Sequence, residues 1–239
     1  MNTEQQKAVS HRFGPASFWS MFTSPVATLE SLRERPAWLV PVLASAIFSM
    51  AINLFVVRRV GFARLINAAG HSSVVIDPQA AMQSALAHQN LILVFQATST
   101  FMGSFLTILV IAKTISLVLT LCGQNTTFKQ ILAAVAHVVA LSVIVRQSLL
   151  ALTAALIRDL NTLDLRNPVA TNPAFFLQMK SPAAQRLLSA LDVITIVTIG
   201  LLITGLTKVC DRLSRRAASL AVIIPWMTYV GVTLLIPTF

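Results

Sequence analysis

The chain has 239 residues, of which 56% are hydrophobic and only 11% charged, and its mean hydropathy is +0.77. Soluble domains carry about 25% charged residues, so this composition excludes an ordinary soluble domain and indicates a polytopic membrane protein. The net charge is +10. Because the basic residues stand in loops between long apolar runs, we attribute them to orientation in the membrane and to contact with anionic headgroups. No nucleic-acid partner is expected.

Residues 1–37 are predicted to form a cytoplasmic segment that contains a short interfacial helix. They hold no apolar core of the kind found in a removable signal peptide. Ser24 followed by Pro25 is a helix-start signal, and Leu29 and Leu32 share one face of the helix that would follow. We expect this helix to lie flat on the membrane surface and to use Leu29 and Leu32 to bind lipid or a partner; the alternative is an ordinary amphipathic connector.

Residues 38–239 are predicted to form one membrane domain of the all-α class. Five apolar stretches are each long enough, at about 20 residues, to cross a hydrocarbon core of about 30 Å. The five predicted spans lie at about residues 38–57, 91–112, 128–150, 187–209 and 217–236. The apolar run of the second span continues to Leu121, so this helix is expected to tilt or to extend into the interface.

Basic residues set the predicted orientation of these spans. The segment before the first span holds four Lys or Arg, and the short turn between the fourth and fifth spans holds four between Lys208 and Arg216. The two long loops of the opposite side spread similar numbers over much longer stretches. Dense basic loops mark the cytoplasmic side, so we expect the N-terminus to be cytoplasmic and the C-terminus external.

At most four ionisable side chains are expected at membrane depth: Lys113, just past the second span, and His137, Arg146 and Asp192. A charge in the bilayer is costly, so each is expected to find a partner or to reach the surface. Counting about 20 residues from the span ends places Arg146 and Asp192 near the same outer surface. We therefore predict an ion pair that joins the third and fourth spans. Lys113 is expected to extend to the cytoplasmic surface, and His137 to be packed and hydrogen-bonded.

The sequence holds none of the common catalytic or nucleotide-binding motifs. We find no GxxxxGK[ST], GxGxxG, HExxH or GxSxG, and no two carboxylates at helical spacing within a span. Cys122 and Cys210 lack ligand-like spacing, and we expect no disulfide between them. We therefore expect a protein that is not an enzyme and has no catalytic residue, cofactor or metal site.

Two functions are compatible with these features. The first is a scaffold or accessory subunit that acts through membrane lipids and an unknown membrane or cytoplasmic protein partner. The alternative is a small transporter or lipid-translocating component that uses the polar residues of the third and fourth spans.

The apolar residues 175–177, in the second long loop, are expected to return to the membrane surface.

Three short motifs, in this order, resemble the YIP-domain family of five-span membrane proteins. They are Ser24-Pro25 followed by ERPAW at 34–38, Gly123 followed by TFKQILAAVAH at 127–137, and LSALD at 188–192 followed by Gly205. The resemblance covers about residues 18–236 and implies a five-span helical fold. Eukaryotic members are linked to Rab GTPases through a longer cytosolic N-terminal region. This chain resembles the short bacterial members, which implies a bacterial inner membrane as its location.

Overall fold

The structure is a computed structural model that describes residues 18–62, 83–84, 86–157, 169–177 and 181–235. These residues form helices and no strand, so the predicted all-α class is confirmed. The long helices are α4 (Leu39–Val60), α7 (Gln89–Leu121), α8 (Phe128–Leu156), α11 (Val193–Val209) and α12 (Arg215–Leu235). The short helices are η1 (Ser20–Phe22), α3 (Pro25–Ser31), α9 (Pro173–Phe176) and α10 (Pro182–Ala190).

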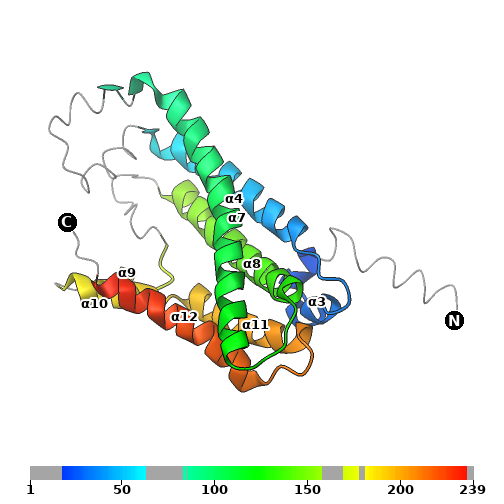
Figure 1. The fold of residues 1–239 in the computed structure, drawn as a ribbon. Coiled ribbons are helices and arrows are strands. Elements are labelled where there is room, and N and C mark those ends of the chain that lie inside the picture. The colour runs from blue at the N-terminus through cyan, green and yellow to red at the C-terminus, as the bar shows by residue number, and fades with distance from the viewer. Residues whose placement is uncertain (1–17, 63–82, 85, 158–168, 178–180, 236–239) are drawn as a thin grey trace, which may run out of the picture.

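Helix α8 lies at the centre of the bundle, where it packs against α4, α7 and α11 (Figure 1). Its sequence explains this place. All of residues 131–138, ILAAVAHV, are buried, and a helix that is apolar on every side has to be covered on every side. The alanines of this stretch let the neighbouring helices approach closely.

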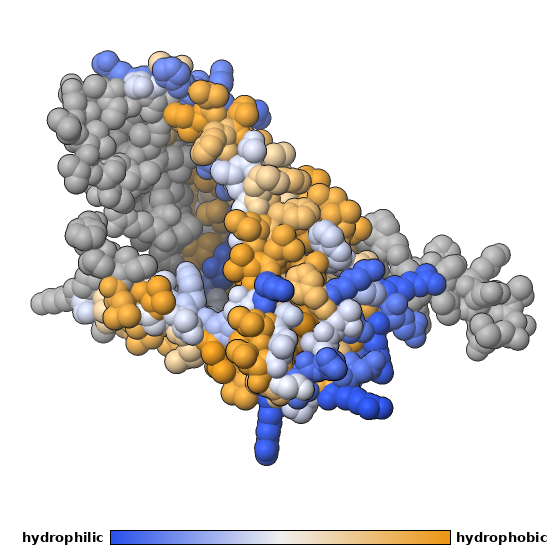
Figure 2. Space-filling model, viewed as in Figure 1, coloured by the Kyte–Doolittle hydropathy of each residue, from blue (hydrophilic) through white to orange (hydrophobic). Residues whose placement is uncertain are grey.

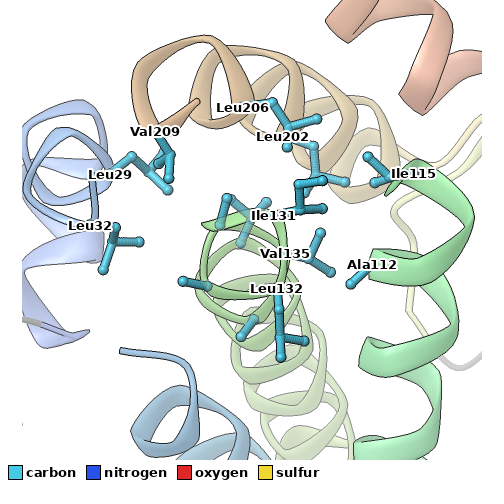
Figure 3. Close-up of a cluster of buried hydrophobic side chains, with 14 of the residues drawn as sticks. Leu29, Leu32, Ala112, Ile115, Ile131, Leu132, Val135, Leu202, Leu206 and Val209 are labelled. Atoms are coloured by element: carbon cyan, nitrogen blue, oxygen red, sulfur yellow. The ribbon is translucent and has the colours of Figure 1, made fainter. Parts of the chain in front are cut away.

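The other long helices surround α8 in two groups. α4 and α7 run beside α8, while α11 and α12 cross the bundle at an angle to these three (Figure 1). α12 packs against both α11 and α7. The apolar core is densest where α3, α7 and α11 meet the first half of α8, and Figure 3 shows side chains from all four helices converging there.

Four of the helices, α4, α7, α8 and α12, are long and apolar enough to cross a membrane. α7 continues to Leu121 as one helix of 33 residues, which is longer than a single crossing needs. It ends where Gly123 takes a φ of +70°, a conformation that glycine adopts without strain.

The predicted fourth span is broken, so a single helix over 187–209 is wrong. α10 ends at Ala190, α11 begins at Val193, and the two helices are bent by 49° relative to each other. α11 has 17 residues and is therefore about 25 Å long, shorter than a hydrocarbon core of about 30 Å. The break places Asp192 ahead of α11 rather than inside its first turn.

Candidate functional site

The apolar face of α3 packs inside the protein against α11. Leu29 is fully buried and Leu32 is 3% exposed. A β-carbon added at Gly205 of α11 would lie 3.2 Å from both δ-carbons of Leu29, so this glycine leaves the space that Leu29 fills. The prediction that Leu29 and Leu32 contact lipid or a partner is therefore wrong. The helix is amphipathic as predicted, but α11 covers its apolar face.

Two ion pairs join α3 and the residues just after it to the end of α11 and the turn that follows α11. The Nζ of Lys208 lies 2.6 Å from the Oε1 of Glu30, and Arg33 pairs with Asp211. All four side chains are about half exposed, and such pairs contribute about 0–1 kcal/mol each. Burial of Leu29 therefore supplies most of the stability of this contact, and the ion pairs fix its register.

A second polar cluster lies between α8 and the start of α11. Asp192 is 5% exposed and caps α11, because its Oδ1 accepts a hydrogen bond of 2.7 Å from the Ile194 N–H. Its Oδ2 lies 3.1 Å from the Nη2 of Arg146 on α8. The same Nη2 donates to the Thr195 hydroxyl at 3.3 Å. The structure thus brings together the two charged residues that were expected to meet.

The cluster continues along the contact between α8 and α11. The hydroxyl groups of Ser142 and Thr198 are hydrogen-bonded to each other. From Asp192 to Thr198 the polar side chains cover about 9 Å along α11. At the break, the Val193 N–H donates to the Thr171 carbonyl at 3.0 Å, so this backbone donor has a partner outside the helix.

His137 and Lys113, the other two ionisable residues expected at membrane depth, lie apart from this cluster. His137 is 1% exposed; its Nδ1 lies 2.9 Å from the Ala133 carbonyl oxygen and its ring lies 5.9 Å from that of Phe18. It is a packed, hydrogen-bonded side chain. Lys113 is exposed, and its Nζ lies 5.6 Å from the ring centroid of Phe128. Phe128 is the first residue of α8, directly after the turn from α7.

Within the ranges that the structure describes, no group of three or more His, Cys, Asp or Glu residues is placed to hold a metal ion. The two thiols differ in environment: Cys122 is exposed, whereas Cys210 is buried directly after α11. Burial, and then the charge of Asp211, raises the pKa of Cys210 to about 11.

A family model described as the Yip1 domain matches residues 19–236. The chain belongs to the Yip1 domain family. No curated protein and no solved structure matches it. The match covers all the described helices from η1 to α12, so the whole bundle is the Yip1 domain. Together with its apolar helices, this makes the chain an integral membrane protein.

The structure gives a physical reason for the second and third of the three motifs. TFKQILAAVAH opens the central helix α8, LSALD crosses the break between α10 and α11, and Gly205 receives Leu29. The ion pairs between α3 and α11 were missed from the sequence. A signal was present, since Glu30 and Arg33, like Lys208 and Asp211, are oppositely charged residues three positions apart.

Proposed function

We propose that this Yip1 domain protein is a non-enzymatic membrane scaffold or accessory subunit. Its binding surface would be the basic face, formed by α3 and the turn from Cys210 to Arg216. The basic residues of this turn support a cytoplasmic location for the face. One observation carries the proposal: a short helix and a turn are held together rigidly, and arginines are left exposed beside them.

The unpaired charge of the basic face is positive. Glu30, Arg33, Lys208 and Asp211 neutralise one another in pairs. Arg212, Arg215 and Arg216 are exposed, and none of them forms an ion pair within the described part of the chain. A rigid surface with unpaired guanidinium groups favours an acidic partner, either an acidic protein segment or anionic headgroups.

The test is crosslinking in native membranes, with identification of what co-purifies. The variant R215Q/R216Q should reduce the crosslinked partner several-fold. The matched control is R58Q/R59Q, which removes two arginines at the other end of the bundle and should leave the partner unchanged. Equal recovery of the same partners from the two variants would contradict the proposal. Labelling of Cys122 from both sides of the membrane checks that neither variant has changed its orientation.

A second candidate function is transport of a small solute or a lipid along the α8–α11 contact. The observation that favours it is the broken helix: α11 begins within the polar cluster, as half-helices do at many transporter sites. Flux of an ion or a labelled lipid into proteoliposomes would support transport if Arg146→Gln abolished it. A scaffold would give the same flux as empty liposomes.

A further inference from the structure

We propose that α9 and α10 lie on the membrane surface, at the end of α11 opposite α3, with their apolar side chains in the acyl boundary of that leaflet. The partner is the phospholipid leaflet itself. On this proposal α11 makes the fourth crossing alone, and α10 is an interfacial helix rather than the beginning of a span. The inference is independent of the basic face and of any transport role.

The first support is the apolar surface of these two helices. Each Å² of apolar surface that is exposed to water costs about 25 cal/mol of free energy. A contiguous group of exposed large apolar side chains therefore marks an interaction surface. In this segment the exposed ones are Phe175, Phe176, Leu177, Leu187 and Leu191, with exposures of 45%, 71%, 51%, 45% and 41%.

The second support is that the polar side chains of the same segment bond within the protein. The Nε2 of Gln185 donates to the Ala174 carbonyl at 3.0 Å, which joins α10 to α9. The Nη1 of Arg186 donates to the Thr233 carbonyl at 2.6 Å, which joins α10 to α12. A helix on a water-exposed surface shows the opposite arrangement, with polar groups outward and apolar groups inward.

The third support is continuity with the surface that faces lipid. α10 packs against α12, an apolar membrane helix. Beside the Arg186 contact, Val232 and Leu235 of α12 are 49% and 83% exposed, as expected of residues that face hydrocarbon. Figure 2 shows apolar side chains gathered where α9, α10 and the adjoining end of α12 lie. The bilayer that covers this end of α12 therefore extends over α9 and α10.

The fourth support is the length of α11. Its 17 residues give about 25 Å, so the crossing is a few Å too short for an average bilayer. Apolar helices seated beside the start of α11 would occupy the acyl boundary where the span ends early. Asp192 and Arg146 would then lie at the interface, where charge costs less than at the bilayer centre.

The experiment measures the depth of spin labels on α9 and α10. Single cysteines replace Phe176, Leu187 or Ser189 in a chain that carries Cys122→Ser and Cys210→Ala. Each is labelled with a nitroxide in vesicles of phosphatidylethanolamine and phosphatidylglycerol. Ser189 is the matched control, because it is also exposed but lies about 200° around α10 from Leu187. All three sites are exposed, so the labels should not disturb folding, which circular dichroism checks.

We expect the labels at Phe176 and Leu187 to collide with dissolved oxygen at least several-fold more than with a water-soluble nickel chelate. The label at Ser189 should show the reverse preference. High nickel accessibility at Phe176 and Leu187 would overturn the proposal, because the apolar patch would then face water. Protection from both reagents would overturn it too, by showing that protein covers the patch. An oxygen preference at all three sites would show that α10 is inserted as part of a span.

Discussion

At the residue scale, Asp192 has two roles, which a substitution can separate. It caps α11 and it pairs with Arg146. Its side chain is 8% exposed, whereas that of Arg146 is 52% exposed. The two partners therefore depend on the pair to different degrees. Arg146 can reach water or headgroups without Asp192, but a buried carboxylate has no such alternative.

This asymmetry predicts unequal effects of removing each charge. Arg146→Gln should lower the free energy of unfolding by about 2–3 kcal/mol, since it leaves Asp192 buried without a cation. Asp192→Asn should cost about 1 kcal/mol or less, because asparagine is also a good helix cap. Thermal unfolding in detergent measures both. Equal losses would show that the pair, rather than burial of the carboxylate, sets the cost.

The two cysteines allow a second test at this scale. Thiol reagents attack the thiolate, and at pH 8 a thiol of pKa about 11 is about one part in a thousand ionised. Burial limits access to Cys210 further. A maleimide should therefore modify Cys122 completely before Cys210 reacts in the folded protein, and mass spectrometry after digestion reads both sites. Raising the pH to 10 should speed modification at Cys210 by increasing its thiolate fraction. Comparable rates at pH 8 would contradict this assignment.

At the scale of elements, the contact of α3 with α11 depends on the space at Gly205. The 2.6 Å ion pair of Glu30 and Lys208 lets a carbodiimide form an amide bond directly between them, which reports the contact. Gly205→Leu should greatly reduce that crosslink, since its side chain needs the space of Leu29. Gly200→Leu is the matched control: it lies on the same helix with nothing within 4 Å of an added β-carbon, and should leave the crosslink unchanged.

A further consequence concerns the cost of losing Leu29 itself. Leu29→Ala should lower the free energy of unfolding by about 2–5 kcal/mol, as for other fully buried leucines. If Gly205→Leu left the crosslink intact, the contact of α3 with α11 would not depend on the space at Gly205.

The same element shows what the sequence can and cannot predict. The start of α3 at Pro25 and its apolar face follow from local chemistry, so both were predictable. What covers that face depends on a residue almost 180 positions later in the chain, and no local pattern gives it. The break before Val193 was only partly predictable. Hydropathy is continuous from Leu187 to Val209, but an Asp directly ahead of an apolar run is a helix-cap signal.

At the scale of the whole molecule, helix α8 joins the candidate sites. Its buried first half holds α3, α7 and α11 together, while Arg146 lies nearer its other end. Depth along a span follows from a local count of residues, so a similar depth for Arg146 and Asp192 was predictable, whereas the packing of α8 against α11, which brings them into contact, does not follow from that count. Which helix occupies the centre of the bundle was not predictable in this way. The apolar composition of ILAAVAHV does explain why this stretch is buried on every side.

The orientation of the whole molecule in the membrane is also predicted. The turn from Lys208 to Arg216 carries four basic residues, and short loops rich in Lys and Arg stay on the cytoplasmic side of the membrane. We therefore expect this turn and Cys122 to face the cytoplasm, and α10 to face outward. In right-side-out vesicles of a Cys210→Ala chain, a membrane-impermeant thiol reagent should leave Cys122 unmodified until the vesicles are opened. The same reagent should modify a cysteine at Ser189 at once. A reporter fused after Phe239 should read as external. Modification of Cys122 in sealed vesicles, with a cytoplasmic reading at Phe239, would show the reverse orientation, and the basic face would then lie on the wrong side for a cytoplasmic partner.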